Sequence, residues 1–229
     1  MTAHIERINI PLTSPLIIAA LLFSTAACSN PSAVSTSNNK STTTESKEIS
    51  TSDNDTQTAT QTKTSKPAFT TKAIATFDEP WAMTALPIAD SKAPKLLVTQ
   101  KTGELFIVDT ATGNKTKIEG MPTVAYGGQG GLGDIIVAPD FATSNTVYLS
   151  YVEAGAGADS NKFGAKVIKA TLSGLETTTP TLQDITPIWQ QSPKVTGQGH
   201  YSHRLLFSPD GRYLYISSGE RQDKDPAQD

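Results

Sequence analysis

From Pro67 to the end of the chain, short apolar runs alternate with turn segments rich in Gly, Pro, Asp and Asn. No segment keeps the 3.6-residue period of an amphipathic helix over about a dozen residues, so the pattern favours β-strands. Thr102-Gly103 and Thr112-Gly113-Asn114 have the composition of tight turns between consecutive strands. The first four runs predict one antiparallel unit, with strands over residues 81–86, 95–100, 104–109 and 115–118.

A second and a third unit follow the same pattern. Their strands are expected over residues 134–138, 146–152, 166–172 and 184–190, and then over 204–207 and 213–217. The opening segments AMTALP (82–87), DIIVAP (134–139) and RLLFSP (204–209) can be laid over one another. A constant strand-turn-strand opening at irregular spacing is typical of β-propeller blades with variable outer loops. A sandwich of short strands is the structural alternative.

The number of units bears on how much of a propeller is present. Two blades are complete, and the third ends after its second strand, before the polar segment that reaches Asp229. Propellers close with about four to eight blades, because an open fan leaves strand edges unpaired and a blade face uncovered. We therefore expect an all-β fold in which residues 67–229 form the N-terminal part of a β-propeller, about two and a half blades.

The N-terminus has the pattern of an export signal over residues 1–27. The apolar run from Leu16 to Phe23 is too short to cross a hydrocarbon layer about 30 Å thick, and small residues follow it. Cys28 comes directly after Ala27, as in a bacterial lipobox, which predicts that Cys28 is lipidated. The alternative is ordinary signal-peptidase cleavage after Ala27, with an incidental thiol. The lipoprotein interpretation places the protein in the periplasm, anchored through its lipid to the bacterial outer membrane.

Composition limits the other possibilities. Residues 29–66 are Ser, Thr, Asn, Gln and Lys with almost no large apolar side chain, which predicts a disordered linker between lipid and folded domain. The formal net charge of −3 gives no electrostatic reason to expect a nucleic-acid partner. A single cysteine allows no internal disulfide and no multi-cysteine metal site.

Two histidines lie in the predicted folded part, within PKVTGQGHYSHRLLF. His200 directly precedes a first blade strand, at the rim where propeller loops gather, and a neutral imidazole there can accept a proton. The plainer interpretation is a loop histidine that satisfies backbone groups. His200 and His203 could also suggest a metal pair, but no third ligand stands near them, so we expect no metal site here.

A glycine-rich segment, residues 127–133, precedes the first strand of the second blade. Glycines permit positive φ and close approach of a flat ligand to the backbone. The segment is no dinucleotide fingerprint, because no βαβ unit follows it. Gln129 is the one side chain in the run that could hydrogen-bond a ligand specifically. The alternative is a tight turn between blades.

Four segments in fixed order carry a resemblance to a known family. They are DEPWAMTALP, LLVTQKTGELFIVD, AYGGQGGLGDIIVAPDFATSNTVYLSYVE and PKVTGQGHYSHRLLFSPDGRYLYISSGERQDKDPAQD. Together, over about residues 68–229, they resemble the soluble aldose sugar dehydrogenases that depend on pyrroloquinoline quinone (PQQ), within the glucose/sorbosone dehydrogenase family. The resemblance implies a six-bladed β-propeller, in agreement with the repeats.

The resemblance also implies a reaction and its residues. His200 aligns with the catalytic histidine, which removes the hydroxyl proton at C1 of an aldose sugar while hydride passes to PQQ and a lactone forms. His200 thereby also lies at the cofactor, and Gln129 aligns with a glutamine that contacts PQQ. Arg204 matches a recurrent arginine, which we interpret as a packing or pairing residue at the blade start. The family's calcium ligands are expected in blades beyond this chain, and electrons pass on to an acceptor that the sequence does not identify.

Three features depart from the family pattern. Gly199 replaces a usually polar residue before the histidine, and His203 stands where the family tends to have a small residue. Asp223 and Asp225 fall short of a calcium-loop spacing, which favours a solvated charged loop. These departures leave a second hypothesis open, a non-catalytic envelope propeller lipoprotein that binds polysaccharide or protein partners. On either hypothesis the piece alone is expected to be inactive.

Overall fold

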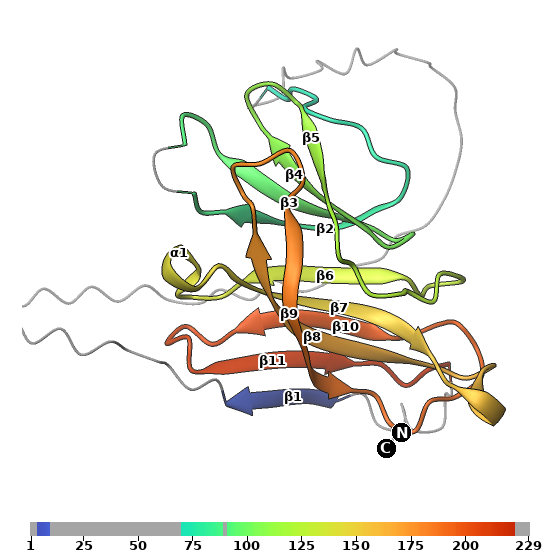
Figure 1. Ribbon diagram of the computed structural model, residues 1–229. Coiled ribbons are helices and arrows are strands. Elements are labelled where there is room, and N and C mark those ends of the chain that lie inside the picture. Colours follow the sequence, from blue (N-terminus) through green and yellow to red (C-terminus); the bar gives the residue numbers. More distant parts are fainter. Residues whose placement is uncertain (1–3, 10–69, 89–90, 223–229) are drawn as a thin grey trace, which may run out of the picture. The chain divides into compact units, whose positions relative to one another are not determined.

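The computed structural model describes residues 4–9, 70–88 and 91–222 (Figure 1). These residues form eleven strands, one short α-helix and one 3-10 turn. Cys28, the predicted linker and most of the predicted signal peptide lie outside the described residues, so those interpretations stay predictions. In the part of the chain that is described, no helix combines the length and the apolarity that a bilayer crossing requires.

The first blade is a four-stranded antiparallel sheet in the order β2-β3-β4-β5. Its strands are β2 (Pro80–Leu86), β3 (Lys95–Gln100), β4 (Glu104–Asp109) and β5 (Lys115–Ile118). The last three have the bounds predicted from the sequence, because each apolar run is closed by turn residues. Their register pairs Leu97 with Ile107 and Val98 with Phe106 across β3 and β4.

The second blade is a longer antiparallel sheet in the order β6-β7-β8-β9. Its strands are β6 (Leu132–Val137), β7 (Thr146–Ala154), β8 (Phe163–Ser173) and β9 (Thr181–Gln190). The sequence did not predict helix α1 (Phe141–Ser144) between β6 and β7, because four residues are too few to show a helical period. Asn145 ends α1 in the left-handed conformation, with a φ of 51°. The turn η1 (Gly157–Asp159) connects β7 to β8.

The third sheet has the order β1-β11-β10. Strands β10 (Ser202–Phe207) and β11 (Tyr213–Ser218) were predicted, each within two residues of its bounds. Strand β1 (His4–Asn9) was not predicted, since it falls within the proposed signal peptide. It pairs with β11 in antiparallel register, from His4 opposite Ser218 to Asn9 opposite Tyr213. The signal-peptide interpretation of residues 1–27 is not tested by this pairing.

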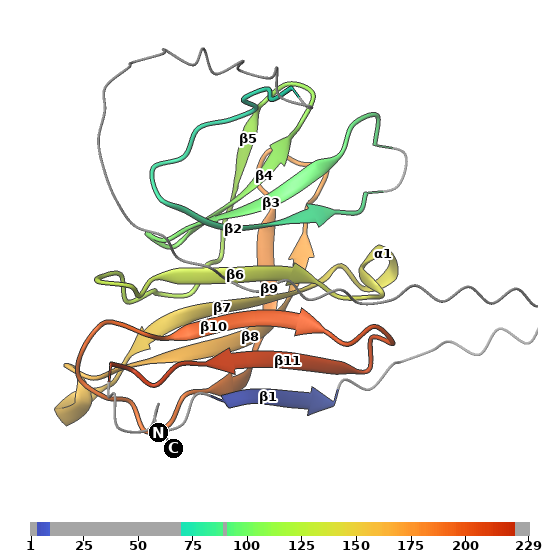
Figure 2. The ribbon, with the colours of Figure 1, turned by 180° about the vertical axis from the view of Figure 1, so that it is seen from behind.

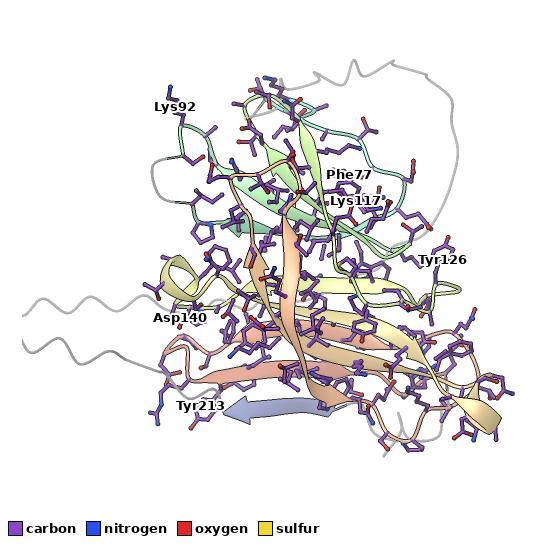
Figure 3. The ribbon with its side chains drawn as sticks, in the orientation of Figure 1. Phe77, Lys92, Lys117, Tyr126, Asp140 and Tyr213 are labelled. Carbon is purple, nitrogen blue, oxygen red and sulfur yellow. The ribbon has the colours of Figure 1, made fainter. Side chains whose placement is uncertain are left out.

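Strands β2, β6 and β10, which begin the three blades, are neighbours, because β6 contacts both β2 and β10 (Figure 2). Apolar side chains fill the space between successive sheets (Figure 3). The core between the first and second blades includes Leu97, Leu105, Ile118, Ile135, Leu149 and Ile168. The core between the second blade and the third sheet includes Tyr148, Val167, Leu205, Leu214 and Ile216. This packing fixes the ends of β2, β6 and β10 beside one another.

Candidate active site

The starts of the three inner strands meet at one cavity. Trp81 lies at the start of β2, Gln129 precedes β6, and His200 precedes β10. The cavity has a volume of about 480 Å³ and is lined by Trp81, Gln129, His200, Tyr201, Ser202, His203 and Glu220. The structure therefore brings together the two residues that the sequence singled out.

Gln129 and His200 are joined directly, although they are far apart in the chain. The backbone N–H of His200 donates to Oε1 of Gln129 at 2.7 Å, and the backbone N–H of Gln129 donates to the carbonyl of Gln198 at 2.7 Å. The loop before β6 and the loop before β10 are thus fastened to each other. Because Oε1 accepts from the backbone, Nε2 of Gln129 is the atom left to donate to a ligand.

The glycine-rich segment forms the tight turn between blades that the sequence left as its alternative. Gly127 and Gly130 form an isolated antiparallel bridge across this turn. Gly128 has a φ of 54°, and a Cβ built there would lie 2.4 Å from the carbonyl oxygen of Gln198. Only glycine permits this approach of the two loops. The close contact at this glycine is therefore with a neighbouring loop of the chain.

Polar side chains brace the same turn from the first blade. Lys101 donates to the carbonyl of Gly128 at 2.6 Å, with its side chain only 16% exposed. The hydroxyl of Tyr126 donates to Glu79 at 2.6 Å, and the Lys101 ammonium lies 5.3 Å from the centre of the Tyr126 ring (Figure 3). These contacts hold the peptide that carries Gln129.

Glu220 holds the imidazole of His200. Its Oε1 contacts Nδ1 of His200, and the His200 side chain is 44% exposed while that of Glu220 is 15% exposed. The hydrogen bond from His200 lowers the pKa of Glu220, so the carboxylate stays ionised. A carboxylate at Nδ1 favours the proton on that nitrogen and leaves the Nε2 lone pair to accept another proton. The arrangement can act as a general base.

Glu220 is a site residue that the sequence did not reveal. Glu220 follows β11, and Ser218 of β11 pairs with Ser202 of β10, so the end of β11 lies beside the start of β10. The signal in the sequence was a carboxylate two residues after β11, the strand that pairs with β10. Recognising it required the register of the pair, which the apolar pattern did not fix.

Arg221, also missed, stabilises the loop that carries His200. It is 4% exposed, and its guanidinium donates to three backbone carbonyls, those of Gly199 at 3.0 Å, Gly197 at 2.8 Å and Phe163 at 2.6 Å. It also lies 3.7 Å above the centre of the Tyr201 ring. The Phe163 carbonyl, in β8, also accepts from the backbone N–H of Val195, and the Gly197 carbonyl also accepts from the Tyr201 hydroxyl. Arg221 is thus the buried side chain that joins β8 to the loop before β10.

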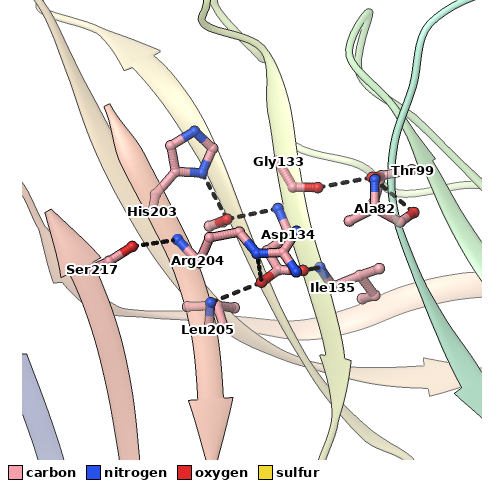
Figure 4. A network of polar contacts seen from close by, with 10 residues as sticks. Ala82, Thr99, Gly133, Asp134, Ile135, His203, Arg204, Leu205 and Ser217 are labelled. Carbon is pink, nitrogen blue, oxygen red and sulfur yellow. Dashed lines mark hydrogen bonds and ion pairs between the residues drawn. The ribbon is translucent and has the colours of Figure 1, made fainter. Parts of the chain in front are cut away.

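His203 occupies a different environment from His200. It is 2% exposed, and its Nδ1 lies 2.8 Å from Oγ of Ser150 (Figure 4). Its ring stacks on that of Trp81, with centroids 6.5 Å apart. Burial lowers the pKa of His203 to about 4, so the ring is neutral at physiological pH. The two histidines have separate partners, Glu220 and Ser150.

Arg204 and Gly199 have structural explanations. Nε of Arg204 lies 3.3 Å from Oδ2 of Asp134, and its side chain is 65% exposed, in agreement with a pairing residue at the blade start. A Cβ built at Gly199 would lie 2.3 Å from the side chain of Gln222, so a larger residue there would require that side chain to move. Neither residue lines the cavity.

No group of three or more His, Cys, Asp or Glu suited to a metal ion occurs among the described residues. Asp223 and Asp225 lie outside them. Another cavity, about 410 Å³ in volume, lies on the first blade and is lined by residues that include Ile74, Trp81 and Met83. Its lining is apolar apart from Lys72, and it has no acid–base pair comparable to His200 and Glu220.

Comparison with known proteins identifies the family. The pattern described as glucose/sorbosone dehydrogenase matches residues 77–229, which is more than half of the chain. The chain belongs to the glucose/sorbosone dehydrogenase family. It is 37% identical over 152 residues to aldose sugar dehydrogenase YliI of Escherichia coli (strain K12), an alignment that covers 66% of this chain and 38% of that protein.

Solved structures of the family have the same fold. The apo-form of the soluble aldose sugar dehydrogenase from Escherichia coli is 37% identical, with a TM-score of 0.57, covering 66% of this chain and 41% of that one. The PQQ-bound aldose sugar dehydrogenase from Streptomyces coelicolor is 26% identical, with a TM-score of 0.56, covering 69% and 43%. The prediction of an all-β chain that forms part of a β-propeller is confirmed, and the chain spans about two fifths of its relatives' length.

The cavity fits one part of PQQ, a flat ortho-quinone that carries three carboxyl groups. Trp81 offers an indole face that is 41% exposed, and Nε2 of Gln129 and the imidazole of His200 are polar groups suited to quinone oxygens. Within the described lining no Lys or Arg faces the cavity to balance carboxylates. This part of the glucose/sorbosone dehydrogenase fold thus has groups suited to the quinone edge of PQQ and none suited to its carboxylates.

Proposed function

We propose that the protein oxidises aldose sugars at C1 to the lactone, with PQQ as cofactor and His200 as general base. The observation that carries the proposal is the His200–Glu220 pair at the cavity, fastened to Gln129 through the His200 backbone. Family membership and the PQQ-bound relative support the cofactor.

The chain's own residues divide the work of the reaction. The C1 hydroxyl gives its proton to Nε2 of His200, and the Glu220 carboxylate stabilises the imidazolium that forms. PQQ, when bound, supplies the acceptor for the hydride that leaves C1, which completes a two-electron oxidation. Gln129 would donate through Nε2 to the quinone. A positioned base of this kind contributes about 10²–10⁴-fold to the rate.

Reconstitution of the full-length protein with PQQ and Ca²⁺, followed by dye reduction with several aldoses, tests the proposal. We expect sugar-dependent dye reduction that requires PQQ. Failure of every aldose to reduce the dye, in a preparation shown to bind PQQ, would overturn it and favour the envelope-binding propeller. Calcium enters the proposal through the family resemblance, and omission of Ca²⁺ is expected to lower the yield of active protein.

We propose further that Cys28 carries a lipid and anchors the protein to the outer membrane on its periplasmic side. The position of the single cysteine after Ala27 supports this. Labelling cells with a palmitate analogue should mark the protein, and Cys28→Ser should remove the label and release the protein to the soluble periplasmic fraction. Labelling that survives the substitution would contradict the anchor.

A further inference from the structure

His203 is a buried polar ring in a backbone conformation that side chains rarely adopt. Its φ is 47°, in the left-handed region, and Ser202 before it has a φ of 61°. The ring covers Gly133 so closely that a Cβ there would lie 2.0 Å from Cε1 of His203. Glycine would avoid the backbone cost and an apolar side chain the cost of burying a polar ring, so the histidine at this position points to a function for the ring.

The hydrogen bonds of Ser150 determine which ring nitrogen carries the proton. Oγ of Ser150 accepts from the backbone N–H of Asp134 at 2.8 Å, and Nδ1 of His203 lies 2.8 Å from the same oxygen (Figure 4). No other acceptor for the Ser150 hydroxyl proton occurs among the described residues. The proton of Ser150 is therefore donated to Nδ1, and a neutral ring then carries its own proton on Nε2.

The second nitrogen of the ring faces the cavity. In the described part of the chain no fully buried side-chain nitrogen or oxygen lacks a partner, and Nε2 of His203 makes no hydrogen bond there. Nε2 is therefore accessible, and His203 lines the cavity that also contains His200. Burial lowers the pKa of the ring to about 4, so the ring stays a neutral donor.

We propose that His203 is a substrate-binding residue, whose Nε2–H donates to a hydroxyl oxygen of the aldose beside the carbon that His200 deprotonates. This inference rests on the proposed function. A neutral donor suits the hydroxyl of an uncharged sugar, whereas the carboxylates of PQQ call for cations. The ring of Trp81 stacks on that of His203 and helps to keep it in place.

Calorimetric titration of PQQ-free protein with glucose and its 2-deoxy, 3-deoxy and 6-deoxy analogues tests the inference without turnover. One deoxy sugar is expected to bind about three- to tenfold more weakly than glucose, the loss typical of one hydrogen bond. The variant His203→Asn keeps an acceptor for Ser150 and loses the donor at Nε2, so its binding of glucose should weaken by the same factor. The deoxy sugar that the wild type binds more weakly should then bind to this variant as well as glucose does.

His203→Gln is the matched variant, because its Nε2 can occupy the position of the imidazole Nε2, and it should restore the preference for glucose. If His203→Asn binds glucose and the three deoxy analogues more weakly by the same factor, the inference is overturned. It is also overturned if the variant keeps the wild-type preference for glucose over each deoxy sugar. If the wild-type protein binds no aldose, the proposed function fails instead. A lower PQQ affinity with unchanged sugar binding would assign Nε2 to the cofactor and contradict the substrate role.

Discussion

Leu149 and His203 are both buried, yet the regions around them are stabilised differently. Leu149 lies in β7 in the apolar core between the first two blades, fully buried in a regular strand register. His203 lies at the rim, where the backbone has positive φ and the buried groups are polar. The core of the blades is stabilised by apolar burial. At the rim, hydrogen bonds hold a strained backbone that places side chains at the cavity.

The largest effect on stability is expected at the rim, from Arg221→Ala. Three backbone carbonyls would lose a charged donor, although those of Phe163 and Gly197 keep a second donor in the Val195 N–H and the Tyr201 hydroxyl. Each hydrogen bond to a charged group contributes about 1.5–3 kcal/mol, so we expect a loss of about 3–5 kcal/mol. Urea denaturation of wild type and variant measures it. Arg221→Lys should recover part of the loss, since an ammonium lacks the guanidinium fork. A change below 1 kcal/mol would show that the loop does not depend on Arg221.

In the core, Leu149→Ala should lower the free energy of unfolding by about 2–5 kcal/mol, through lost apolar burial and the cavity left behind. Ile185→Ala, at a position 39% exposed on β9, is the control and should cost less than about 1 kcal/mol. Equal losses at the two positions would contradict the placement of the core between the blades.

The pH dependence of stability should distinguish the buried histidine from the core. The pKa of His203 is lowered to about 4 in the folded protein, against 6.5 for an unperturbed histidine. The unfolded chain binds more protons between these values, so stability falls as pH drops from 6.5 to 4, by up to about 3 kcal/mol. Urea titrations across this window should show that His203→Asn removes this part of the slope. An identical slope in wild type and variant would refute the assignment.

A smaller effect, on turnover rather than stability, is expected from Glu220→Gln. The amide can still contact Nδ1 of His200 but cannot stabilise an imidazolium, so kcat should fall about ten- to a hundredfold with little change in melting temperature. Glu220→Asp, which keeps the carboxylate, should retain more activity than the amide. Steady-state dye reduction measures both, and an unchanged kcat in Glu220→Gln would remove Glu220 from the mechanism.

The difference between the apolar core and the polar rim also explains which features the sequence could predict. Strands β3, β4 and β5 follow from apolar runs closed by turn residues, because burial and turn chemistry are local signals. The placement of Gln129 and His200 at one rim follows from both preceding first strands of blades. The contacts of Glu220 and Arg221 with the His200 loop depend on strand register and on positive φ at non-glycine residues, which no local pattern marks.

His200 is assigned as the base of a PQQ-dependent sugar oxidation, and rapid mixing of the PQQ-loaded full-length protein with an aldose measures this role. We expect a sugar-dependent change in quinone absorbance in the wild type. In His200→Ala this change should be slower by about 10²–10⁴-fold, although PQQ still binds. The same rate in both proteins, or no absorbance change in the PQQ-loaded wild type, would exclude His200 as the base.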